Sequence, residues 1–332
     1  MKTRREFVFA SGAGLWLLAT PFAAFAQQQG KVWRIGFLAP RSRPTSSDPD
    51  VYSAFPQGMR ELGYIEGKNF VIEWRFADGK FERLPGLAAE LVQMKVDVIV
   101  AAGTVATQVA QRATTTIPIV IAASLDPVGS GFVKSLTRPG GNITGLSLAT
   151  SDFSPKHLEL LMTAVPKLSR VAVLVNPDNS AHPALLKSVQ AAAQKLGVQV
   201  LPVSARTPED IERGFSTMKR ERAEAVIVAA DAFFVLQRRQ IAELALRHRL
   251  ATMATNREYA EAGGLMSYGQ NVADFYWRAA TYVDKILKGA RPGELPIEQP
   301  TTLSLAINRK TAKALGLAIP QELLLRADRV IE

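Results

Sequence analysis

Asp126 stands at the end of a continuous apolar run, in the stretch IVIAASLDPVGSG at residues 119–131. A carboxylate in that place is a catalytic acid, a contact for a cationic group of a ligand, or the start of an Asp-Pro turn. A catalytic acid needs a base or a second titratable group within reach, and the neighbouring residues supply neither. The sequence therefore leaves a turn and a ligand contact as the open interpretations of Asp126, with catalysis the least favoured.

Other small polar residues follow apolar runs in the same way. Ligands bind beyond the carboxyl ends of the strands in open parallel sheets, so these residues are candidate ligand contacts. In chain order they are Gly103, Thr104, Ser124, Asn176, Ser180, Asp231 and Asn256. Thr104 opens a predicted helix, whose free amides suit a carboxylate or a phosphate, although plain N-capping explains the same pattern. Phe233 and Tyr268 are candidate walls for an apolar ligand, with core packing as the alternative.

Several kinds of chemistry are excluded or disfavoured by the composition. The chain has no cysteine, which excludes disulfides, thiol nucleophiles and thiolate metal sites. The sequence also lacks a Gly-x-Ser-x-Gly elbow, a His-Glu zinc spacing and a phosphate-binding Gly-Lys-Ser/Thr loop. His157, His182 and His248 are expected at the surface or at helix caps. We therefore expect no catalytic residue, no metal and no cofactor.

Strand-like and helix-like segments alternate along the chain. Continuous apolar runs of strand length are typical of a parallel sheet that is covered on both faces. These runs lie at residues 96–103, 117–124, 171–176, 225–231 and 250–255. Further strands are predicted at 32–40 and at 69–77, where polar and apolar residues alternate in the second of the two. Helices are predicted at 84–92, 182–197, 207–215 and 272–288 from apolar periodicity and from capping residues. Such an alternation predicts a doubly wound α/β fold.

The alternation occurs twice, which predicts two lobes. We assign residues 31–147 plus about 264–298 to the first α/β lobe, and 148–263 plus about 299–332 to the second. The segment RPGGNITGLSLATSDFSP at 138–155 is rich in Gly, Ser, Thr and Pro, and we interpret it as the crossover between them.

The N-terminal segment has the features of an export signal. Lys2, Arg4 and Arg5 precede an uncharged stretch at 7–26 that ends in Ala24-Phe25-Ala26, which predicts cleavage after about Ala26. The paired arginines resemble a twin-arginine signal. A membrane anchor is the alternative, since about 20 uncharged residues just span a bilayer. We expect a periplasmic protein without stable membrane insertion after cleavage. The formal charge of +10 is scattered, and export argues against a nucleic-acid partner.

Three blocks of the chain, at residues 58–101, 117–147 and 308–332, resemble the substrate-binding proteins of ABC transporters. The segments DPVGSGFVKSL, RPGGNITG and KTAKALGL within them are the most specific. The resemblance is strongest to the group that includes binders of tryptophan and other aromatic amino acids. It implies a type I periplasmic-binding-protein fold, in which two doubly wound parallel-sheet lobes are joined by a three-segment hinge.

This resemblance also implies a function. The protein would be a monomeric receptor that closes over a small organic solute, such as an amino acid or an aromatic or carboxylic acid, and delivers it to a membrane permease and its ATPase subunit. By analogy, helix-end amides near Thr104 would hold a carboxylate, and Asp126 or Asp231 would hold an ammonium. Arg41 or Arg43 would instead favour an acidic or aromatic-acid solute. The alternatives are an exported sensor subunit of a signalling system and, less favoured, a periplasmic α/β enzyme.

Overall fold

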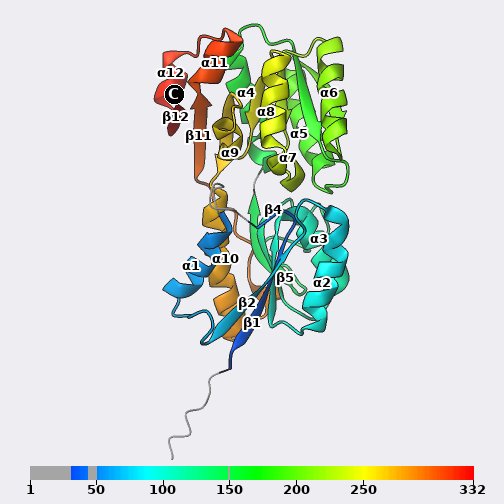
Figure 1. Ribbon diagram of the computed structural model, residues 1–332, viewed down its shortest axis with the longest axis vertical. Coiled ribbons are helices and arrows are strands. Elements are labelled where there is room, and N and C mark those ends of the chain that lie inside the picture. The colour runs from blue at the N-terminus through cyan, green and yellow to red at the C-terminus, as the bar shows by residue number, and fades with distance from the viewer. Residues whose placement is uncertain (1–30, 44–50, 149) are drawn as a thin grey trace, which may run out of the picture. The chain divides into compact units, whose positions relative to one another are not determined.

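The computed structural model describes residues 31–43, 51–148 and 150–332. The predicted signal peptide and part of the loop after Arg43 therefore lie outside the described residues. In the compact unit Val32–Glu332, two α/β lobes stack along the longest axis (Figure 1). We call the lobe built on β1–β5 the first lobe and the lobe built on β6–β12 the second lobe.

The first lobe contains a parallel sheet whose five strands, among the described residues, run in the order β2-β1-β3-β4-β5. Helices α1 and α10 pack against each other, and α10 contacts β4 and β5. Helices α2 and α3 form a second packed pair, in which α2 contacts β1 and β2 and α3 contacts β3 and β4. The elements are β1 (Trp33–Ala39), η1 (Val51–Ser53), α1 (Ala54–Glu61), β2 (Phe70–Phe76), η2 (Phe81–Arg83), α2 (Leu84–Gln93), β3 (Val98–Ala102), α3 (Gly103–Ala113), β4 (Ile119–Leu125), β5 (Ile143–Leu148), α10 (Val272–Leu287) and η3 (Pro292–Glu294).

The second lobe contains a sheet of seven described strands in the order β12-β11-β10-β9-β8-β6-β7. Neighbouring strands pair in parallel except for β10 and β11, which are antiparallel. β11 and β12 therefore run opposite to the other five strands, a local departure from the parallel sheet that the sequence predicts. The elements are α4 (Thr150–Ala164), β6 (Arg170–Val175), α5 (His182–Leu196), β7 (Gln199–Ser204), α6 (Pro208–Arg220), β8 (Ala225–Val228), α7 (Ala232–Leu236), α8 (Arg238–Arg247), β9 (Ala251–Ala254), α9 (Arg257–Glu261), β10 (Met266–Gln270), β11 (Leu303–Asn308), α11 (Arg309–Leu315), α12 (Gln321–Leu325) and β12 (Arg329–Ile331).

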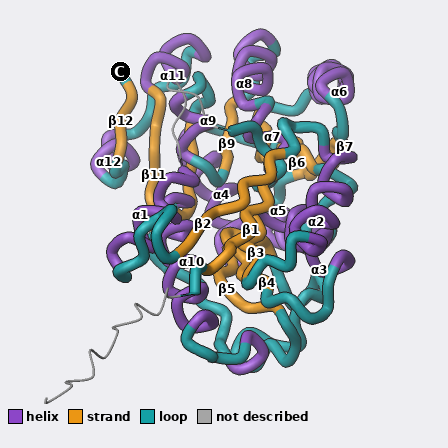
Figure 2. The backbone as a smooth tube through the Cα atoms, turned by 60° about the horizontal axis from the view of Figure 1, so that its bottom comes forward, coloured by secondary structure: helices purple, strands orange, loops and turns teal. Residues whose placement is uncertain are grey.

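The predicted α/β alternation is confirmed, and local signals place several element ends correctly. Thr207 forms a reciprocal capping box with Asp210 at the start of α6. Gly197 ends α5 with a φ of 71°, a left-handed conformation that favours glycine. Figure 2 shows the resulting arrangement, with helices on both sides of the strands.

Two assignments from the sequence differ from the structure. The segment 138–155, interpreted as a crossover, contains all of β5, which pairs with β4 and completes the first sheet. The segment from 264, assigned to the first lobe, begins with β10, which pairs with β9 in the second sheet. Leu265 and Met266 are fully buried in the second lobe's core. Burial of these apolar side chains holds β10 in the second lobe, so the chain returns to the first lobe only at α10.

An aromatic cluster in the first lobe positions part of its rim. Phe37 on β1 packs against Trp74 on β2 with ring centroids 4.6 Å apart, and Tyr52 meets Tyr276 of α10 edge to face at 5.0 Å. Because α10 follows β10 of the second lobe, this contact is made by a segment that returns from that lobe. The packing holds two tyrosine rings at the end of the first sheet that faces the second lobe.

Candidate functional site

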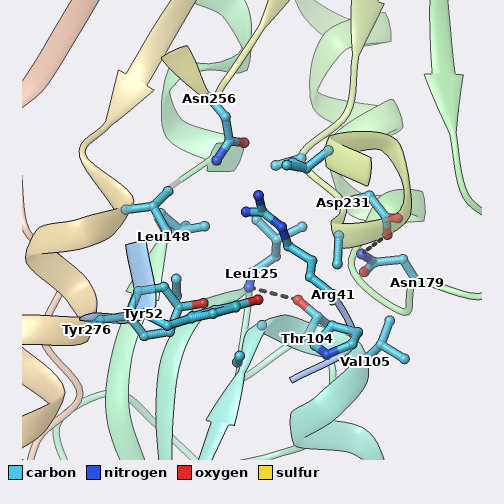
Figure 3. Close-up of a pocket in the computed structure, with 18 residues that line it drawn as sticks. Arg41, Tyr52, Thr104, Val105, Leu125, Leu148, Asn179, Asp231, Asn256 and Tyr276 are labelled. Atoms are coloured by element: carbon cyan, nitrogen blue, oxygen red, sulfur yellow. Dashed lines mark hydrogen bonds between the residues drawn. The ribbon is translucent and has the colours of Figure 1, made fainter. Parts of the chain in front are cut away.

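A small cavity of about 70 Å³ lies between the two lobes, and we call it the inner cavity. The first lobe contributes the ends of strands and the residues that follow them, whereas the second lobe contributes residues that follow β6, β8 and β9. Its wall includes Arg41, Tyr52, Gly103, Thr104, Leu125, Leu148 and Tyr276 from the first lobe, and Asn179, Asp231, Val235 and Asn256 from the second. Figure 3 shows these side chains converging from both lobes.

Thr104 does not act as the N-cap of α3. The helix begins at Gly103, its N-cap is Ala102, and no side chain caps it. The Thr104 hydroxyl oxygen instead accepts a hydrogen bond from the backbone N–H of Leu125 at 2.9 Å, and Ser124 Oγ lies 3.2 Å from it. Ser124 is fully buried and does not reach the cavity wall. The alternative of simple N-capping therefore does not apply to Thr104.

β4 is irregular just before it reaches the cavity. Its pairing with β5 shifts register between Ile121 and Ser124, and Ala123 has a φ of 61°. A bulge of this kind bends a strand and turns the side chains beyond it. It brings Ala123 and Leu125 to the cavity wall while Ser124 lies behind them.

On the second lobe, buried hydrogen bonds hold the carboxylate of Asp231. Its Oδ1 accepts from the backbone N–H of Phe233 at 2.8 Å and from Asn176 Nδ2 at 3.3 Å, and its Oδ2 accepts from Asn179 Nδ2 at 2.8 Å. Asp231 is thus the N-cap of α7 as well as part of the cavity wall. Asn176 supports Asp231 from behind and does not line the cavity.

His182 links the backbone segments that carry Asn176 and Asp231. Its Nδ1 accepts a hydrogen bond from the backbone N–H of Asn176 at 2.8 Å, so its Nε2–H donates to the Ala230 carbonyl oxygen at 3.1 Å. Burial lowers the pKa of His182, and the nearby Asp231 carboxylate only partly opposes that shift. His182 begins α5, as expected, but it is buried and structural.

The surface position expected for His157 is wrong. His157 is buried against β10, and its Nε2–H donates to the Tyr268 carbonyl oxygen at 2.6 Å. Burial lowers its pKa to about 4, although that hydrogen bond raises it. The position on a helix that crosses over β9 and β10 buries the ring, which the residues around it in the sequence do not reveal.

The remaining predicted contacts lie away from the inner cavity. Asp126 Oδ1 accepts from the backbone N–H of Gly129 at 2.8 Å. Ser180 is exposed, and its hydroxyl donates to Ser130 Oγ of the first lobe at 3.0 Å.

The two aromatic candidates also lie outside the inner cavity. Phe233 is buried in the second lobe's core and borders a separate surface hollow. Tyr268 packs against the second lobe's other core cluster, beside His157.

The structure thus places Gly103, Thr104, Asp231 and Asn256 on the cavity wall, out of the predicted set. It adds Tyr52, Leu148, Asn179 and Tyr276, which were not predicted. Asn179 follows Asn176 in the same turn, and that spacing was a usable signal. The two tyrosines gave none, because they meet only through the return of α10 to the first lobe.

Arg41 crosses the cavity from the end of β1 toward Asn256 (Figure 3). Its Nη2 donates to Glu258 Oε1 of the second lobe at 3.1 Å, and the side chains are 16% and 11% exposed. Burial opposes the charged form of Arg41, but the nearby Tyr52 and Glu258 outweigh it and raise the pKa. Arg41 therefore stays a cation inside the pocket.

Two α/β lobes that meet over a pocket at their strand ends define the architecture of type I periplasmic binding proteins. Residues 45–331 match the profile of the family described as ABC transporter substrate binding protein. The chain belongs to this family. The family and its structural neighbours bind solutes and are not enzymes.

A tyrosine-binding protein from Clostridioides difficile (strain R20291) is 27% identical over 265 residues, which cover 79% of this chain and 75% of the relative. The solved structure of an ABC domain in complex with L-Trp from Streptococcus pneumonia is 25% identical with a TM-score of 0.84, covering 91% of this chain and 100% of that one. The ligand-free, open structure of a substrate-binding protein with adhesive properties from Clostridium difficile is also 25% identical, with a TM-score of 0.64 over 90% of this chain and 99% of that one.

None of the described helices is both long enough and apolar enough to span a membrane.

Proposed function

We propose that this protein is the periplasmic solute receptor of an ABC importer, which closes its lobes over a small organic solute and delivers it to a permease. The observation that carries this proposal is the inner cavity, whose wall combines strand ends of both lobes in a chain of this family. Only a solute that binds the closed arrangement better than the open one drives such closure.

The charged and aromatic groups of the wall favour an amino acid or a related carboxylic acid as the solute. Arg41 and the first turn of α3 present positive charge and free amides, and Tyr52 and Tyr276 present aromatic faces. The names of the tyrosine-binding relative and of the L-Trp complex support the same class. The higher TM-score against the L-Trp complex than against the ligand-free, open structure supports a closed arrangement of the lobes here.

The test begins with the full chain expressed in a bacterium and extracted from the periplasmic fraction. Intact mass spectrometry of the extracted protein should show an N-terminus near Gln27, in accord with the predicted cleavage. A thermal-shift screen then covers amino acids, deaminated aromatic acids, small carboxylates, nucleobases and sugars. A solute at about 100 times its dissociation constant adds about 2.7 kcal/mol to the free energy of unfolding.

Each outcome bears on the proposal. A stabilising solute that also disappears from the medium only when the cognate permease is present supports a transport receptor. Silence across the whole panel, or retention of the protein in the cytoplasm with an intact leader, would contradict it.

A further inference from the structure

The Arg41–Glu258 ion pair differs from the other charge pairs of the described chain in its position. It joins the loop after β1 in the first lobe to α9 in the second lobe, and both side chains are largely buried. The pair Arg206–Asp178, by contrast, is 60% and 64% exposed and lies within the second lobe. Removing one partner of a buried ion pair is strongly destabilising, because the remaining charge is then buried without a counter-charge.

The same ion pair separates two cavities. Arg41 lines the inner cavity, whereas Glu258 lines a neighbouring hollow of about 260 Å³, which we call the outer cavity. Asn256 and Val272 line both. With the ion pair in place, the inner cavity has about half the ~150 Å³ of an engineered cavity that holds benzene. Arg41 therefore fills space on the wall of the inner cavity, next to the residues that both cavities share.

The charged side chains of the inner cavity differ in how far their hydrogen-bonding capacity is already used. Among the described residues of its wall, Arg41 is the only cation. Asp231 is the wall's carboxylate, but its two oxygens already accept three hydrogen bonds from Phe233, Asn176 and Asn179. A cationic group of a solute thus finds its best partner in Glu258, provided that Glu258 leaves Arg41.

Building on the proposed function, we propose that the solute exchanges with this ion pair: its carboxylate replaces Glu258 on Arg41, and Glu258 takes the cationic group of the solute. A solute with a single charge would leave either Arg41 or Glu258 buried and unpaired, whereas a zwitterion satisfies both. The pair therefore determines specificity for solutes that carry both charges. Because its two residues belong to different lobes, a zwitterion between them also holds the lobes together.

The decisive experiment compares each solute with two analogues that lack one charge. The probes are L-tyrosine, L-tryptophan, L-leucine and L-alanine, each measured beside the matching deaminated acid and the matching decarboxylated amine. Affinities are determined by calorimetry for the wild type, Arg41→Gln and Glu258→Gln. We expect the wild type to bind at least one zwitterion about tenfold or more tighter than its acid and its amine.

The two variants should shift this preference in opposite directions. Arg41→Gln should lower the affinity for the zwitterion and raise the affinity for the amine, because Glu258 is then unpaired and attracts a cation. Glu258→Gln should lower the affinity for the zwitterion and raise the affinity for the acid, because Arg41 is then unpaired and attracts an anion. If either residue merely holds the lobes together, its substitution would change the affinities for the zwitterion, the acid and the amine by the same factor.

Matched controls come from the loop after β1 and from a helix of the second lobe. Arg43, which the sequence offered as an alternative to Arg41, is exposed and does not line the inner cavity, and its guanidinium lies 5.8 Å from the Phe76 ring centre. Arg43→Gln is therefore the control for Arg41→Gln. Glu243→Gln changes an exposed glutamate of α8 in the second lobe. Both controls should leave the three affinities unchanged.

Other results would overturn the exchange while leaving the receptor function standing. One is an equal change in all three affinities in Arg41→Gln and Glu258→Gln. Another is a wild-type preference for the acid, the amine or an uncharged solute. Failure of all four zwitterions to bind the wild type would also overturn the exchange, and the wider thermal-shift panel would then decide the receptor function separately.

Discussion

The backbone N–H of Leu125, the last residue of β4, donates a hydrogen bond to the hydroxyl oxygen of Thr104 in the first turn of α3, at 2.9 Å. Leu125 and Thr104 are both buried and both line the inner cavity. The bond therefore fixes the strand end relative to the free amides of the helix, so that the two form one continuous part of the cavity wall (Figure 3).

Thr104→Val removes this acceptor without changing the size of the side chain. The buried N–H of Leu125 is then left without its partner, which costs about 1–3 kcal/mol of unfolding free energy. We also expect solute affinity to fall about tenfold, since the wall loses a hydroxyl and its fixed geometry. Urea denaturation and calorimetry measure the two effects. Thr104→Ser keeps the hydroxyl and should behave like the wild type, and wild-type stability in Thr104→Val would show that this bond contributes nothing.

Gly145→Ala should severely destabilise the first lobe. Gly145 on β5 has a φ of 131°, and a Cβ there would lie 2.3 Å from the Ile121 carbonyl oxygen, beside the β4 bulge. Both the backbone conformation and the contact exclude a side chain, so we expect a loss of about 4 kcal/mol or more, or about 10 °C in Tm. Gly141→Ala is the matched control, because a Cβ at Gly141 meets nothing within 4 Å. Equal melting temperatures for the two variants would refute the steric argument.

His157 should make the protein less stable as the pH falls below neutral. Burial lowers its pKa to about 4 from an ordinary value of 6.5, so the unfolded chain takes up a proton at a pH where the folded chain does not. The stabilisation is fully present above pH 6.5 and is lost as the pH falls toward 4, by about 3 kcal/mol in total. His157→Gln retains a donor for the Tyr268 carbonyl but cannot titrate. Its unfolding free energy should depend less steeply on pH over that range, and identical slopes would contradict the prediction.

Asp126→Ala should disturb a turn more than it disturbs solute binding. The Asp126 carboxylate accepts the Gly129 N–H at 2.8 Å and does not line the inner cavity. Loss of that bond should cost about 1 kcal/mol in chemical denaturation, with solute affinity within about twofold of the wild type. Asp126→Asn retains the accepting oxygen and serves as the control. A tenfold loss of affinity in Asp126→Ala would instead make Asp126 a ligand contact.

Strand ends that are recognisable in the sequence locate part of the cavity wall. Thr104 and Asp231 each follow a run of apolar residues, and parallel strands place such positions at one edge of a sheet. Position after an apolar run does not, however, separate residues of the wall from those behind it. Ser124 and Asn176 have the same sequence signal as Thr104 and Asp231, yet they support their neighbours from beneath.

The sequence by itself determined the α/β class, most strands and helices and the family resemblance, because apolar periodicity and capping are local properties of the chain. Only the tertiary structure decided that β10 joins the second sheet, that α10 carries Tyr276 back to Tyr52, and that Arg41 meets Glu258. These three relationships join residues far apart in sequence. They depend on how two sheets bury their apolar faces and on which lobe surfaces then face each other, and no local pattern encodes that outcome.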